Sequence, residues 1–173
     1  MPIYAYGDAQ PNIHPEAYVH PEAVIIGNVT IGKLASIWPC AVLRGDSNRI
    51  VVGERTSIQD GAVIHVTSEL PTLIGAECTV GHNAHLEGCT MQDGSLVGSG
   101  ALVHHSAIIQ TGALVAAGAV VTHGTIVPVG ALAVGVPAKI LEGRADAEVL
   151  AYSVETYTRN ALEYPKLMRR LDV

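Results

Sequence analysis

The sequence predicts a mainly β protein: a parallel β-helix built from six-residue repeats, followed by one α-helix. An aliphatic residue returns at every sixth position over most of the chain. The 173 residues include 18 glycines and no phenylalanine, and 49% are hydrophobic, which favours tightly turned strands over a helical bundle. A six-residue period fits neither an α-helix nor a simple alternating strand. It suits short strands joined by tight corners, three to a coil, with the coils stacked.

The repeat begins at Ile13 and changes register three times, at points where loops can leave the coil. We therefore predict a lead-in over residues 1–12, the β-helix over 13–137, and an exit segment with a terminal helix over 138–173. Twenty positions are expected to point inward and form the core: Ile13, Val19, Ile25, Ile31, Ile37, Leu43, Val52, Ile58, Ile64, Ile74, Val80, Leu86, Met91, Val97, Val103, Ile109, Val115, Val121, Val127 and Ala133.

The terminal helix is predicted from a change of spacing after the Gly-Val-Pro sequence at 135–137. Asp146 can cap its first turn, and Pro165 should kink or interrupt it. Apolar residues at three- and four-residue steps give one stripe that should lie against the outside of the coil. This stripe consists of Leu150, Val154, Tyr157, Ala161 and Tyr164.

Composition narrows the possible partners and the compartment. The formal charge is −6, and the 10 lysines and arginines form no basic run, which argues against nucleic acid or an anionic membrane surface as the main partner. No apolar run reaches the roughly 20 residues of a membrane span. The three cysteines form no CxxC pair and the N-terminal residues do not resemble a signal peptide, so we expect a cytoplasmic protein.

The repeat also predicts which polar side chains meet. Residues directly after an inward position point outward, and residues three repeats apart should stack on neighbouring coils about 4.8 Å apart. Arg44, His65, Glu87 and His104 then form one outward column, with His65 beside Glu87. His104 and His105 either contact this column or belong to ordinary surface.

A second pair, Asp60 and His82, is expected to stack on a neighbouring face or corner. Two imidazoles and a carboxylate can bind a metal with a position left open for water or substrate, although surface histidines are common. His82 lies too far around the coil to meet His65 within one chain. A metal site using both would therefore lie between subunits.

Two stretches, SIWPCAVLRGDSNRIVVGERTSIQDGAVIH and IGAECTVGHNAHLEGC, resemble the γ-class carbonic anhydrase family and its ferripyochelin-binding-protein-like relatives. The resemblance covers nearly the whole chain. It implies a left-handed coil, a homotrimer with metal sites between subunits, and zinc as the metal, with iron or cobalt as alternatives. It also implies reversible hydration of CO2 to bicarbonate by a metal-bound hydroxide.

The resemblance assigns roles to individual residues. His65 matches the first metal ligand, and His82 matches the ligand donated by the adjacent chain. Gln59 would orient the metal-bound hydroxide, and Asp60 would hold the interface or support a ligand. The ion pair at the family's trimer interface falls on Arg44 and Asp46.

The third ligand position of the family is occupied here by Glu87 instead of histidine. Three outcomes follow: Glu87 binds the metal as a carboxylate, His85 replaces it, or the site binds metal weakly. We favour Glu87, because the column places it beside His65 whatever its identity. Two histidines and one carboxylate also form non-haem iron sites, so iron is an alternative to zinc.

Three functions follow from these residues. The first is a carbonic anhydrase-like lyase. The second is a non-catalytic trimer that binds metal or siderophore or serves in assembly, which the substitution at Glu87 favours. The loop 66–73 also leaves strong activity uncertain. It carries one carboxylate, Glu69, whereas strongly active members of the family are associated with an extended acidic loop. The third is acyl transfer, which rests on fold analogy alone.

Overall fold

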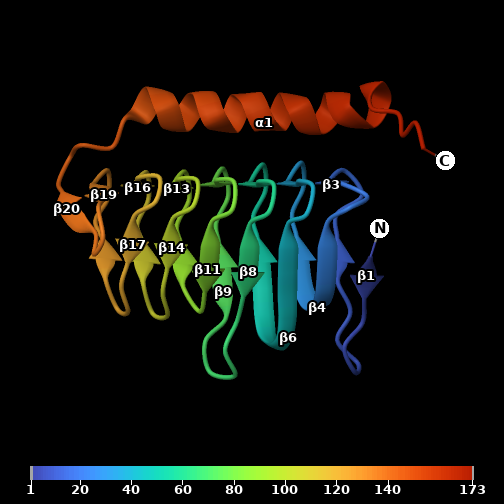
Figure 1. Cartoon of the computed structure of the whole chain (residues 1–173), viewed down its shortest axis with the longest axis horizontal. Coiled ribbons are helices and arrows are strands. Elements are labelled where there is room, and N and C mark those ends of the chain that lie inside the picture. Colours follow the sequence, from blue (N-terminus) through green and yellow to red (C-terminus); the bar gives the residue numbers. More distant parts are fainter. Residues whose placement is uncertain (1, 173) are drawn as a thin grey trace.

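The computed structural model describes residues 2–172 and confirms the predicted fold class, a left-handed parallel β-helix of about seven coils with one C-terminal helix (Figure 1). Each complete coil contributes short strands to three faces of a prism. Equivalent strands of successive coils pair in parallel, so each face is a sheet whose strands run across the long axis.

The first face carries the candidate ligands and consists of the first parts of β4 (Val24–Ile31) and β6 (Val42–Val52), then β8 (Val63–His65), β11 (His85–Glu87), β14 (Leu102–Val103) and β17 (Val120–Val121), with β1 (Ile3–Tyr4) paired to β4. The second face consists of β2 (Asn12–Ile13), the later parts of β4 and β6, β9 (Thr72–Ile74), β12 (Thr90–Met91), β15 (Ile108–Ile109) and β18 (Ile126–Val127).

The third face consists of β3 (Tyr18–Val19), β5 (Ser36–Ile37), β7 (Ser57–Ile58), β10 (Thr79–Val80), β13 (Leu96–Val97), β16 (Leu114–Val115) and β19 (Leu132–Val134). The short strand β20 (Lys139–Leu141) pairs antiparallel with β19 and ends the stack. Because β4 and β6 continue across a corner, the first and second faces form one hydrogen-bonded sheet.

The core lies inside the prism, as the repeat predicts. Of the twenty inward positions, all but Ile13 and Val19 belong to one buried cluster, and those two pack against it while partly exposed. The alternation is sharp on β8, where Ile64 is fully buried while its neighbour Val63 is 37% exposed. Ile64 pairs in register with residues of the coils on either side, Leu43 and Leu86. Stacked aliphatic columns of this kind supply the apolar burial that stabilises the fold.

The C-terminal helix, α1 (Ala147–Leu167), lies along the outside of the third face (Figure 1). Asp146 is its N-cap, as predicted, and its side chain accepts hydrogen bonds from the backbone N–H groups of Glu148 and Val149. The helix is not interrupted at Pro165 but continues to Leu167. Proline cannot donate an N–H to the carbonyl of Ala161, four residues earlier, and the helix ends two residues after it.

The predicted apolar stripe of α1 faces the coil. Leu150 and Ala161 are buried, and Tyr157 and Tyr164 contact the buried Trp38 edge-to-face with ring centroids 5.6 and 4.8 Å away. The tyrosines therefore pack, as expected for this stripe. Within residues 2–172, no helix combines the length and the apolar character needed to cross a bilayer.

Candidate metal centre

The first group of candidate site residues lies on the first face, in the first part of β6 and at the ends of β8 and β11. Arg44 pairs in register with His65, and His65 pairs with Glu87, so the predicted column exists. The inward residues of the same strands fix this register, because a shift by one position would turn the aliphatic column outward. The column therefore follows directly from the hydrophobic repeat.

Both ring nitrogens of His65 have carboxylate partners within the chain. Its Nδ1 lies 3.0 Å from Oε1 of Glu87, and its Nε2 lies 3.3 Å from Oδ1 of Asp46. Arg44 donates a hydrogen bond to the other oxygen of Asp46. Burial opposes ionisation of Asp46, but hydrogen bonds from Arg44 and His65 outweigh it and lower the pKa of this carboxyl. The pair expected at a trimer interface thus also forms within one chain.

Glu87 is surrounded by imidazoles. Besides His65 on Oε1, its Oε2 lies 3.3 Å from Nε2 of His105 and 3.5 Å from Nε2 of His85. Burial opposes ionisation of Glu87, but hydrogen bonds and charge interactions with His105 and His65 outweigh it and lower the pKa of the carboxyl. Glu87 is therefore a carboxylate at neutral pH, and its side chain is 27% exposed.

The second group lies at the corner between the third and first faces. Nδ1 of His82 is 2.8 Å from Oδ2 of Asp60, which confirms that these two residues stack on neighbouring coils. Gln59, directly before Asp60, is buried at the edge of a cavity of about 360 Å³ between the third face and α1, and His82 also lines this cavity. Tyr157 of α1 lines the same cavity as Gln59.

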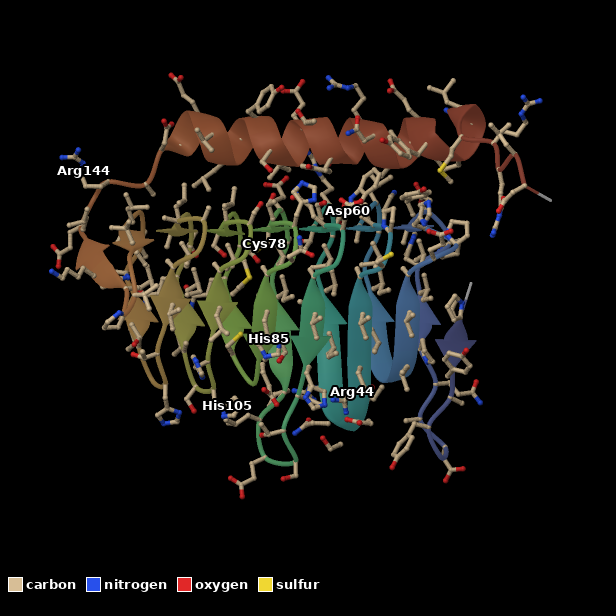
Figure 2. All side chains as sticks on the ribbon, viewed as in Figure 1. Arg44, Asp60, Cys78, His85, His105 and Arg144 are labelled. Carbon is tan, nitrogen blue, oxygen red and sulfur yellow. The ribbon has the colours of Figure 1, made fainter. Side chains whose placement is uncertain are left out.

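The two groups are separate within one chain. Figure 2 shows Asp60 on the side of the coil that faces α1, whereas Arg44, His85 and His105 lie toward the opposite edge. The strand β11 runs from the side of His82 to Glu87, and its three residues span roughly 10 Å. Among residues 2–172 of a single chain, no three histidine, cysteine or acidic side chains are placed so that they could hold one metal ion. His65 and His82 can therefore serve one metal only if they come from different subunits.

The repeat predicted the first contacts but not all of them. It placed His104 in the column, yet His104 is exposed and its neighbour His105 contacts Glu87. The reason is that the strand β14 ends at Val103, and the chain turns through a corner where alternation no longer applies. Ser106 has a positive φ of 61°, which marks that corner. Tyr157 was expected to pack, and its place beside Gln59 on the cavity was not foreseen, because the alignment of α1 along the coil cannot be read from its spacing.

Residues 11–45 match the family described as bacterial transferase hexapeptide (six repeats). The chain is 44% identical over 150 residues to a probable carbonic anhydrase of Methanocaldococcus jannaschii, covering 87% of this chain and 91% of that protein. It is 42% identical over 152 residues to γ carbonic anhydrase 2, mitochondrial, of Arabidopsis thaliana, covering 84% of this chain but 55% of the plant protein. It therefore spans about half the length of that relative.

A further relative is the carnitine operon protein CaiE of Escherichia coli, 35% identical over 173 residues, with 100% of this chain and 86% of that protein covered. Among solved structures, a hexapeptide transferase family protein of Anaplasma phagocytophilum superposes with a TM-score of 0.90 at 39% identity, covering 94% of this chain and 98% of that one. Together with the coil and its outward column, these likenesses show that the chain belongs to the γ-carbonic-anhydrase-like family of hexapeptide-repeat proteins.

Proposed function

We propose that the protein is a carbonic anhydrase-like lyase that reversibly hydrates CO2 to bicarbonate at a metal centre shared between subunits of a homotrimer. The observation that carries the proposal is the contact between His65 and Glu87, two donor side chains brought together from neighbouring coils. The relatives named carbonic anhydrases support the same reaction.

The donor atoms fit a divalent metal. Nδ1 of His65 and Oε1 of Glu87 are 3.0 Å apart. Two ligands that each lie about 2.0–2.1 Å from a tetrahedral metal would be separated by roughly 3.3 Å. A third donor has to come from outside the chain, and His82 of the partner subunit supplies it in this proposal. Zinc suits two imidazoles and a carboxylate, while iron or cobalt would also bind this set.

The chain's own residues prepare the site in specific ways. Asp60 lies against Nδ1 of His82, so it fixes the ring and leaves Nε2 free for a metal across the interface. Gln59 lies beside Tyr157 at the edge of the neighbouring cavity, where its amide can orient a water molecule or substrate. A bound metal would supply Lewis acidity and bring the pKa of water toward neutrality.

The first face also favours association with copies of itself. Val63 is 37% exposed beside the polar column, and Leu102 of β14 is half-buried in the isolated chain. Closed symmetric assembly would bury these apolar groups and bring the two groups of candidate residues together. We place the trimer in the cytoplasm, which suits the three free cysteines.

A mixing experiment tests the shared centre. His65→Ala and His82→Ala homotrimers should each lose the metal, because every site lacks one ligand. The two variants are then dissociated and reassembled together. An interface is complete where a His82→Ala chain supplies its intact His65 and a His65→Ala chain supplies its intact His82. Random mixing should then restore roughly a quarter of the wild-type metal content. Metal analysis that finds no recovery in verified mixed trimers would show that the site is not shared.

The reaction itself is tested by stopped-flow CO2 hydration. Wild-type protein reconstituted with zinc, iron or cobalt should be active, and the mixed trimers should recover activity in proportion to their metal. If the protein shows no CO2 hydration at full occupancy with any of the three metals, the proposed lyase activity is wrong.

A non-catalytic metal- or siderophore-binding trimer is the second candidate, and one observation favours it. Both nitrogens of His65 and both oxygens of Glu87 already have partners within the chain, so the cluster is satisfied without a metal. The carnitine operon protein CaiE is also among the relatives. A tight stoichiometric complex with an iron chelate, without CO2 hydration, would select this alternative.

Acyl transfer has no support from the site residues. Its basis is a fold likeness, such as that to perosamine N-acetyltransferase of Caulobacter crescentus, whose structure contains CoA and GDP-perosamine. That structure superposes with a TM-score of 0.56 at 28% identity, covering 76% of this chain and 56% of that one.

A further inference from the structure

We propose that His105 is a positioning residue that holds the Glu87 carboxylate so that only Oε1 is presented beside His65. This inference rests on the proposed function, in which Glu87 is a metal ligand. It explains how a carboxylate works at a position where the resemblance leads one to expect an imidazole. His105 would act through Glu87 and would not bind the metal itself.

The two oxygens of Glu87 have different surroundings. Oε1 lies 3.0 Å from Nδ1 of His65, on the side of the candidate metal position. Oε2 lies 3.3 Å from Nε2 of His105, which belongs to the next coil. A carboxylate with one oxygen engaged in this way can offer the other as a single donor. Without that engagement it is free to rotate or to bind a metal through both oxygens.

The backbone holds His105 in this place. The N–H of Ser106 donates to the carbonyl of Gly88 over 2.7 Å, so the corner that carries His105 is tied to the residue that follows Glu87. On its other side, the carbonyl of His105 accepts from the N–H of Gly124 over 3.0 Å. The corner is thus fixed between two coils, with Nε2 of His105 3.3 Å from Oε2 of Glu87.

Neither neighbouring histidine serves equally well. His85 lies on the same strand as Glu87, and its Nε2 is farther from Oε2, at 3.5 Å. His104 is exposed, and within residues 2–172 its ring contacts His105 edge-on at 6.4 Å instead of reaching the carboxylate. His105 is therefore the nearer of the two imidazoles that contact Oε2, whereas Oε1 contacts His65.

The test compares His105→Leu, His105→Gln and a control, His123→Leu, in the full-length assembly. Leucine removes the donor, whereas the amide of glutamine retains one near the position of Nε2. His123 occupies the equivalent corner one coil farther on, is exposed, and forms no ion pair among residues 2–172. Zn²⁺ affinity is measured by competition with a chelator, and the visible absorption of the Co²⁺-loaded protein reports the coordination number.

We expect His105→Leu to weaken Zn²⁺ binding about 10–100-fold, the usual cost of losing a group that orients a metal ligand. The Co²⁺ absorption should decrease as Glu87 becomes free to bind through both oxygens. His105→Gln should restore most of the affinity, and His123→Leu should match the wild type. A merely structural role would change the melting temperature of His105→Leu without changing the Co²⁺ spectrum per bound metal.

The outcomes separate this inference from the proposed function. Wild-type protein that binds no metal would overturn the proposed function and the inference with it. Wild-type binding with His105→Leu indistinguishable from His123→Leu would overturn only the role of His105. A third result would also overturn the positioning role: His105→Gln does not recover the affinity, and both His105→Leu and His105→Gln alter the Co²⁺ spectrum. His105 would then be a metal ligand itself. If His105→Leu does not fold, His105→Ala takes its place in the comparison with His105→Gln and His123→Leu, because alanine also removes the donor.

Discussion

Replacing Ile64 by alanine tests whether the aliphatic columns carry the stability of the coil. Ile64 is fully buried on β8, where it directly precedes His65 and points into the core. It stacks between Leu43 and Leu86 of the neighbouring coils. The change removes three carbons, and at roughly 0.8 kcal/mol per buried methylene the lost transfer free energy is about 2.4 kcal/mol. A residual cavity adds to this cost, so we expect the free energy of unfolding to fall by about 3–4 kcal/mol.

The matched control is Ile126→Ala, the same change on a strand of the second face. Ile126 is 52% exposed, so its replacement should cost under about 1 kcal/mol. Urea unfolding of both variants at one protein concentration measures the difference. For a chain of this length, Ile64→Ala should also lower the melting temperature by roughly 6–16 °C. An Ile126 variant as destabilised as the Ile64 variant would refute the assignment of the core.

Three further predictions follow from single residues. Burial raises the pKa of Cys89 to about 12, so at pH 8 this thiol should resist iodoacetamide in the native protein. The exposed Cys40 should react under the same conditions. Equal labelling of the two cysteines, measured by mass spectrometry, would contradict the burial of Cys89. A methyl group on Gly53 would meet the backbone of Gly75 on the next coil at 2.4 Å, so Gly53→Ala should destabilise by about 1–3 kcal/mol or prevent folding, which thermal denaturation would show. Asp146→Ala removes the N-cap of α1 and should cost about 1 kcal/mol, measured by urea unfolding, with an unchanged midpoint arguing against the cap.

The fold could be predicted from the sequence because one physical requirement repeats. Every coil must bury an aliphatic side chain at the same place, so the positions of Ile64 and Leu86 fix the strand register. That register in turn fixed the contact between His65 and Glu87 and the stacking of Asp60 with His82. These contacts follow from counting residues, since each lies on a strand or just after one.

Features at corners and beyond the coil could not be predicted in the same way. Alternation ends where β14 ends, so the sequence did not show that His105, not His104, would reach Glu87. Cys40 lies at such a corner, where it is exposed and has a φ of 59°. Pro165 was expected to kink or interrupt α1; the helix is not interrupted there and ends two residues later, at Leu167.

The path of α1 has a consequence for how the molecule unfolds. In a simple repeat array each unit touches only its neighbours, so an end coil can fray alone. Here the last segment of the chain returns along the third face and contacts β3, β5, β7 and β10, including the aromatic group around Trp38 in the early coils. Loosening of the amino-terminal turns therefore also releases the carboxyl-terminal segment. This long-range closure should make the array melt as one cooperative unit instead of peeling from its ends.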